Sequence, residues 1–303
     1  MPVIIPFRLR CAFIDSRTNF VVDMPKIVRE EILKLLMSSK EVLDIYFFDQ
    51  NKYLENFSKI PGPGLEKDAR YFWIFRNLDY EKWVQCRSEA GILGLRGPSA
   101  KDLEFAASHI VQSLQNHNAE RHEGEVLLYF FYNSIRREQD TVGTAGWHDI
   151  VCVWNLLREL IKSSSTAERS LFQTFLRSAL GFISDDKLAD LRGHGNPTDV
   201  FKSLFRRLKP KDLWYALGQV LADSKDPEIP QKQNLTLIID LNSMASAWDG
   251  LDDNISEMTA DMPQAPWTMR ILFTNLPETS DHCQTRPSKI IEYDKERKGA
   301  CSL

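Results

Sequence analysis

Residues 91–114 read GILGLRGPSAKDLEFAASHIVQSL, a pattern that predicts a strand, a turn and a helix. The apolar run Ile92–Leu95 is short enough to be a buried strand, and Gly97 and Pro98 mark the turn. Apolar residues then recur at helical spacing from Leu103 to Leu114. This is the frame of a phosphate-binding loop, but the lysine, the hydroxyl and the inner glycines that hold phosphate are missing. The stretch therefore predicts the fold of a nucleotide switch and argues against ordinary nucleotide hydrolysis.

The composition is that of a globular protein with a sizeable core. The chain has 303 residues, of which 43% are hydrophobic and 26% are charged, values that are ordinary for a soluble protein. A formal net charge of −4 gives no global basic field, which argues against nucleic acid or an acidic membrane as a partner. No run approaches ~20 consecutive apolar residues, so we expect no membrane span.

The cysteines and histidines predict neither disulfides nor a metal centre. Five cysteines are scattered without C-x-x-C spacing, and their odd number argues against a disulfide framework. The six histidines form no H-E-x-x-H or similar ligand pair. We therefore expect reduced thiols in a cytoplasmic protein. Cys152 lies in an apolar helical stripe and is expected to be a buried thiol.

Two parts are predicted along the chain. Residues 24–60 contain apolar residues at helical spacing, and the sequence PGPG at residues 61–64 then interrupts regular structure. We therefore expect an N-terminal helical appendage over residues 1–60 and a main domain over residues 61–303.

Strands alternate with helices in the main domain. Helical patterns cover residues 66–88, 147–161 and 170–182. Four apolar runs besides Ile92–Leu95 are short enough to be strands: Val126–Tyr132, Leu235–Asp240, Arg270–Thr274 and Lys289–Tyr293. No hairpin signal separates them. The pattern predicts an α/β fold with a mostly parallel sheet covered by helices on both faces.

One predicted helix carries a basic face. It follows Thr198 and Asp199, either of which can cap it. Its cations are Lys202, Arg206, Arg207, Lys209 and Lys211. Such a face could contact phosphate backbones, but a solvated face is the favoured interpretation because the overall charge is acidic. We therefore expect no nucleic-acid partner.

The order of motifs over residues 66–293 resembles a known family. An F-W-I-F helix and D-Y-x-K-W precede G-x-L-x-L-x-G-P, and then come H-I-V, V-L-x-Y-F-F, D-L-W, I-I-D and I-L-F-T-N-x-P-E. In this order they resemble the NACHT-like P-loop module, also called nephrocystin-3-like N-terminal, of fungal NOD-like (STAND-class) proteins. The resemblance implies a P-loop NTPase-like three-layer sandwich.

The phosphate loop departs from the family pattern. In the family the Gly-Pro turn opens a Walker A loop that ends in Gly-Lys-Ser/Thr. Alignment without a gap puts Asp102 at the last glycine, Leu103 at the lysine and Glu104 at the hydroxyl, with Lys101 two places early. At ~4 Å and an effective dielectric near 20, each carboxylate repels a unit of phosphate charge by about 4 kcal/mol. A helix N-terminus contributes only ~0.3–1 kcal/mol of attraction, so repulsion dominates.

Two further motifs that the family uses for phosphoryl transfer are also altered. Asp240 falls on the family's magnesium-linked aspartate, but the acidic pair that would orient water falls on Ser243 and Met244. The arginine that senses the γ-phosphate becomes Leu276. Three losses in one scaffold predict a pseudo-NTPase.

The resemblance therefore implies a non-catalytic signalling or protein-interaction module without a cofactor. Its expected partners are proteins, either a second copy or an intact NOD-like protein. The chain lacks counterparts of the helical and winged-helix parts that follow the module in full receptors, so a lone or truncated module is expected. The alternative is an atypical NTPase or kinase that binds ATP or GTP with Mg through Lys101, Asp240 and Glu104.

Overall fold

The computed structural model describes most of the helices and the strands of the main sheet. The described residues are 12–14, 21–58, 74–85, 91–97, 100–121, 125–134, 147–163, 168–222, 234–241, 254–255, 258, 268–275 and 289–292.

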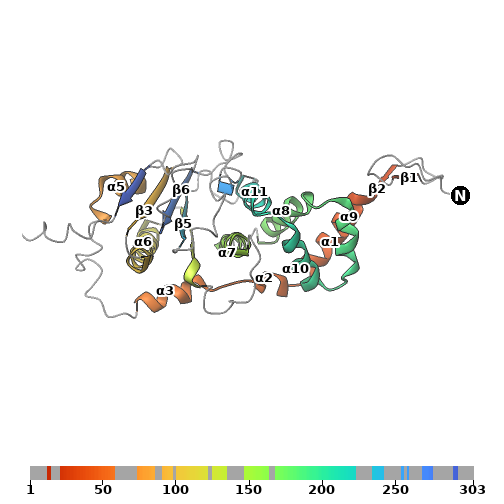
Figure 1. The fold of residues 1–303 in the computed structure, drawn as a ribbon, viewed down its shortest axis with the longest axis horizontal. Helices are drawn as coiled ribbons and strands as arrows, with labels where there is room; N and C mark the ends of the chain where they lie inside the picture. Colours follow the sequence, from red (N-terminus) through yellow and green to blue (C-terminus); the bar gives the residue numbers. More distant parts are fainter. Residues whose placement is uncertain are drawn as a thin grey trace, which may run out of the picture.

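A five-stranded parallel sheet lies toward the left of the view in Figure 1. Its strands are β3 (Gly91–Arg96), β4 (Glu125–Phe131), β5 (Asn234–Asp240), β6 (Thr268–Thr274) and β7 (Lys289–Glu292). They lie in the order β4-β5-β6-β3-β7, and every pair of neighbours is parallel. The parallel sheet predicted from the five apolar runs is thus confirmed.

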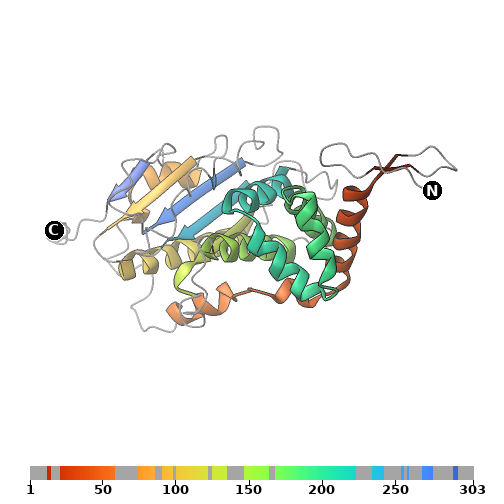
Figure 2. The ribbon, with the colours of Figure 1, turned by 45° about the vertical axis from the view of Figure 1, so that its right-hand side comes forward.

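Helices cover both faces of this sheet (Figure 2). On one face, α6 (Ala100–Arg121) packs its apolar stripe against Leu95 of β3 and Leu272 of β6. On the other face, α7 (Trp147–Ser163) and α11 (Pro210–Ala222) share a core with the alternate residues of β4, β5 and β6. The alternation follows from the strand period of two, which sends successive side chains to opposite faces.

The aromatic segment before β3 anchors the sheet. It contains α5 (Leu78–Gln85), whose Trp83 is buried and donates its Nε1–H to the carbonyl oxygens of Gly91 at 3.1 Å and Ile271 at 3.2 Å. Buried Arg270 of β6 lies over the Trp83 ring, 5.3 Å from its centroid. These contacts fasten α5 to β3 and β6, so the aromatic residues have a packing role here.

A layer of helices extends the fold away from the sheet (Figure 1). It consists of α8 (Glu168–Gly181), α9 (Asp185–Gly193), α10 (Pro197–Arg207) and α1 (Met24–Ser38). Trp154 of α7 stands in the centre of an aromatic cluster, with ring centroids 4.6 Å from Phe201 and 5.4 Å from Phe205. The predicted cap of α10 is wrong, because Asn196 caps it and accepts a hydrogen bond from the backbone N–H of Thr198 at 2.9 Å.

The N-terminal helices share the main core. After a short hairpin, β1 (Ala12–Ile14) and β2 (Val21–Asp23), the chain forms α1, α2 (Glu41–Asp44) and α3 (Gln50–Ser58). Ile32 and Leu36 of α1 belong to the same hydrophobic cluster as α7 and α11. The predicted boundary near residue 60 falls outside the described residues, so the division into 1–60 and 61–303 stays a prediction. Among the described helices, none is both long and apolar enough to cross a membrane.

Candidate functional site at the end of the sheet

The parallel arrangement brings the carboxyl ends of β3, β5 and β6 to one edge. The chain leaves β3 for the distant strand β4, returns through β5 and β6, and places β7 on the far side of β3. The strand order therefore reverses at β3. Open α/β sheets bind their ligands at the carboxyl ends of the strands beside such a reversal. The turn after β3 and the first turn of α6 lie at this point.

The residues of the altered phosphate loop differ in exposure. Gly97 is half-buried directly after β3, and Lys101 on the first turn of α6 is exposed. Asp102 is partly buried. Leu103, only 2% exposed, lies in the core between α6 and the sheet. The Leu103 side chain thus packs inward, against the sheet. Pro98 lies outside the described residues.

Glu104 is the unexpected residue of this turn. Although it is a charged residue, Glu104 is only 5% exposed. Tyr53 of α3 donates its hydroxyl to Glu104 Oε1. The carboxylate is therefore fixed in the interior by a residue far away in the sequence, and no local pattern around Tyr53 predicted this contact.

Asp240 ends β5 and is fully buried. Its Oδ1 accepts hydrogen bonds from Thr274 Oγ1 and Asn275 Nδ2, both at 2.5 Å. Its Oδ2 is buried and has no hydrogen-bond partner among the described residues. One oxygen of the carboxyl thus accepts hydrogen bonds that hold the sheet edge together, and the other oxygen is buried without a hydrogen bond from a described residue.

Asn275 closes the edge between β5, β6 and α6. It adopts a left-handed backbone conformation with φ of 60°, which asparagine tolerates better than most residues. Besides Asp240, its Nδ2 contacts the carbonyl oxygen of Ala100, the first residue of α6, at 3.3 Å. This side-chain amide therefore joins the start of α6 to the end of β6.

Burial sets the protonation of Asp240. Burial, together with the nearby Glu104 charge, raises the pKa of Asp240 to about 7, and the hydrogen bonds from Thr274 and Asn275 offset part of the rise. At neutral pH the carboxyl is therefore partly protonated. A protonated carboxyl is a poor magnesium ligand, since hard cations prefer ionised oxygens.

The other residues that the sequence analysis assigned to the site lie outside the described residues. These are Leu276, at the sensor position, and Ser243 and Met244, at the acidic pair. Within the described part of the chain, no three or more His, Cys, Asp or Glu side chains gather closely enough to hold a metal ion. A metal at Asp240 therefore stays a prediction.

A third buried acid lies on the other face of the sheet. Asp149, in the first turn of α7, accepts hydrogen bonds from Trp214 Nε1 at 2.7 Å and Asn254 Nδ2 at 3.3 Å. Burial raises its pKa to about 6 in spite of these bonds. The neighbouring Cys152 is fully buried, as predicted, and burial raises the pKa of its thiol well above the ordinary value. Both groups are enclosed in the core.

Comparisons of the chain with protein-family models, with curated proteins and with solved structures found no match.

Proposed function

We propose that this protein is a non-catalytic pseudo-NTPase, a signalling or protein-interaction module with a degenerate P-loop NTPase-like sandwich. The observation that carries the proposal is Glu104. This buried carboxylate stands at the position of the magnesium-binding hydroxyl, is fixed by Tyr53 and lies within electrostatic range of Asp240.

The charges at this turn oppose a bound nucleotide. A triphosphate placed after β3 would meet Glu104 in a poorly solvated interior, where each unit repulsion at ~4 Å is about 4 kcal/mol or more. The lysine that would offset this is replaced by buried Leu103. Lys101 is exposed, and neither a hydrogen bond nor an ion pair joins it to buried Asp240. The residues at the turn therefore serve packing better than phosphate binding.

Nucleotide binding at the turn is tested by thermal unfolding with millimolar Mg-ATP or Mg-GTP. A ligand at 100 times its dissociation constant adds about 2.7 kcal/mol of stability. We expect no stabilisation that depends on Lys101 or Asp240, so wild type, Lys101→Ala and Asp240→Asn should respond alike. Stabilisation of the wild type that is lost in both variants would contradict the proposal.

The function that we propose for this module is to bind other proteins. The resemblance to NOD-like proteins suggests self-association or association with an intact NOD-like protein. Size-exclusion chromatography with light scattering, with and without such a protein, should show a species heavier than the monomer. A strict monomer under both conditions would count against this function.

One observation favours the alternative of an atypical NTPase that uses Lys101 and Asp240. Asp240 Oδ2 is buried without a hydrogen-bond partner among the described residues, and Glu104 is close enough to raise the pKa of Asp240. Two such carboxyls could share a divalent cation. ATP or GTP hydrolysis that requires Mg and disappears in Asp240→Asn would support this alternative.

A further inference from the structure

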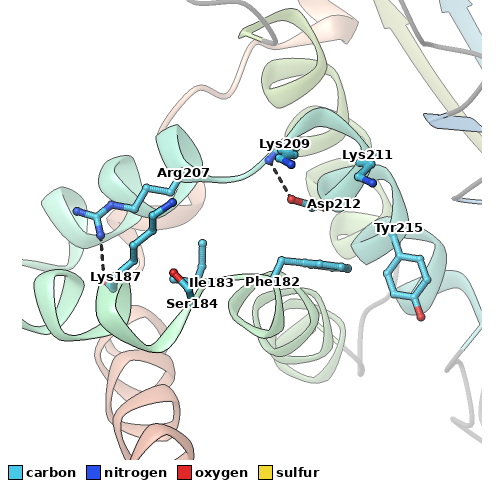
Figure 3. A pocket seen from close by; sticks show the side chains of 9 residues that line it. All are labelled: Phe182, Ile183, Ser184, Lys187, Arg207, Lys209, Lys211, Asp212 and Tyr215. Carbon is cyan, nitrogen blue, oxygen red and sulfur yellow. Dashed lines mark hydrogen bonds between the residues drawn. The ribbon is translucent and has the colours of Figure 1, made fainter. Parts of the chain in front are cut away.

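A pocket of about 510 Å³ lies between two helix-to-helix turns, far from the altered phosphate loop in sequence (Figure 3). The turn from α8 to α9 contributes Phe182, Ile183 and Ser184, and the turn from α10 to α11 contributes Lys209. We call it the basic pocket. Its volume is within the range of small-molecule sites, about 300–1,000 Å³.

Cations outnumber acids in this pocket. Lys187, Arg207, Lys209 and Lys211 line it, against the single carboxylate of Asp212. That carboxylate is already engaged, because its Oδ2 accepts a hydrogen bond from the backbone N–H of Lys209 at 3.0 Å (Figure 3). Lys209 and Lys211 are exposed, and neither forms an ion pair with a described residue. The lining residues therefore carry a formal excess of three positive charges, and an ion pair with Asp190 offsets part of the Arg207 charge. The remaining excess attracts anions.

The wall of the pocket is built across two helices. Arg207 of α10 donates from Nη1 to the carbonyl oxygen of Lys187 in α9 at 2.9 Å, and the same nitrogen lies 3.6 Å from Asp190 Oδ2. Ser184 is the N-cap of α9, and Lys209 directly precedes α11. The amino-terminal ends of both helices thus border the pocket, and each adds partial positive charge.

An aromatic side chain stands beside these cations. Phe182 is 45% exposed, one of few large apolar side chains so exposed among the described residues. Its ring meets Tyr215 edge to face, with centroids 5.5 Å apart and planes at 87°. An exposed phenylalanine held by a second ring offers a surface on which a planar group can stack.

We propose that the basic pocket binds a small phosphorylated molecule that also carries a planar ring, the class to which nucleoside diphosphates belong. The phosphates would lie against Lys187, Lys209 and Lys211, where a diphosphate with several negative charges matches the positive excess better than a single carboxylate does. The ring would cover Phe182. The site is separate from the turn after β3 and does not depend on how the sheet edge functions.

Isothermal titration calorimetry of the full chain with three probes tests whether the lysines bind the phosphates and Phe182 binds the ring. The probes are adenosine diphosphate, inorganic pyrophosphate and adenosine. We expect the diphosphate to bind most tightly, pyrophosphate more weakly and adenosine not measurably. The double substitution Lys209→Gln/Lys211→Gln should weaken both phosphorylated probes about tenfold or more, since it removes two charge-assisted contacts.

Two controls keep the result specific. Lys40→Gln/Lys82→Gln makes the same change in net charge at exposed positions outside the pocket and should leave affinity unchanged. Phe182→Ala should weaken adenosine diphosphate but not pyrophosphate. The proposal is overturned if neither phosphorylated probe binds at millimolar concentration, if both lysine pairs have equal effects, or if adenosine binds as tightly as its diphosphate. Lys101→Ala, at the sheet edge, should not change these affinities.

Discussion

Asp240 and Glu104 are two buried acids at one edge of the sheet. Asp240 still ends β5, but Thr274 and Asn275 use one of its oxygens to hold the sheet edge together. Glu104 adds a second acid at the same edge and is bonded to Tyr53. The nearby Glu104 charge disfavours ionisation of Asp240, in addition to the effect of burial. The protonation of Asp240 therefore makes the stability of this part of the fold depend on pH.

The first prediction concerns the stability of Asp240→Asn. The pKa of Asp240 is raised from 3.8 to about 7, so between these values the native state binds the proton that the unfolded state has lost. Unfolding free energy therefore falls as pH rises through this window, by at most about 1.4 kcal/mol per pH unit from this group. The variant should lose that decline and be at least as stable as the wild type at pH 8. Urea unfolding at pH 5 and pH 8 measures it.

Asp149 titrates in an overlapping window and acts in the same direction in both proteins, so the difference between wild type and variant isolates Asp240. Equal pH dependence in the two proteins would show that Asp240 is ionised in the native state throughout.

Glu104→Gln provides the second prediction. The amide keeps an oxygen for the Tyr53 hydroxyl but removes the charge that raises the pKa of Asp240. The pH at which stability stops falling should therefore move to a lower value than in the wild type. Urea unfolding across pH 4 to 8 would reveal this, and an unchanged profile would mean that burial alone accounts for Asp240.

At the scale of elements, the strands were predictable and some connections were not. Apolar runs such as Val126–Tyr132 and Leu235–Asp240 are buried on both faces, so their composition alone marks them as strands of a parallel sheet. Helix α9 went unpredicted because only Leu188 and Leu191 of its nine residues are buried, which leaves almost no apolar stripe. The cap of α10 was misplaced because three consecutive residues, Asn196 to Thr198, offer competing cap and turn signals.

A third prediction tests the close approach of α11 to a neighbouring segment. A Cβ on Gly218 would overlap the backbone carbonyl of Met258, which cannot move like a side chain. Gly218→Ala should therefore destabilise the protein by roughly 1–3 kcal/mol, as overpacking does. Gly181→Ala is the matched control, because a Cβ there meets nothing and alanine favours helix. Thermal unfolding should rank Gly218→Ala clearly below the control, and equal midpoints would contradict the packing described.

In the whole molecule, residues of the N-terminal helix α3 hold parts of the candidate site in place. Tyr53 holds Glu104, and Gln50 Oε1 accepts the backbone N–H of Phe131 at 2.9 Å, at the end of β4. The positions of Asp240 and Glu104 at one edge could be predicted from strand order and the resemblance. Their enclosure by Tyr53 and Asn275 could not, since these contacts join segments 51 and 35 residues away from their partners.

A fourth prediction tests that integration at Asn155 of α7. This fully buried amide accepts the Phe48 N–H at 2.8 Å and donates to the carbonyl oxygens of Tyr46 at 3.0 Å and Val151 at 2.7 Å. Asn155→Ala leaves the Phe48 donor buried and unpaired, which should cost about 1–3 kcal/mol. Urea unfolding measures the loss. The control is Gln173→Ala, at a partly exposed position of α8, which should stay within about 0.5 kcal/mol of wild type.

The most direct test of the central claim is a crystal structure of the protein grown with millimolar Mg-ATP. It separates the sheet edge from the basic pocket, which solution binding alone does not. The account predicts no nucleotide density between Gly97 and Glu104, with Tyr53 still bonded to the Glu104 carboxylate. Triphosphate density against the first turn of α6, with magnesium at Asp240, would contradict it.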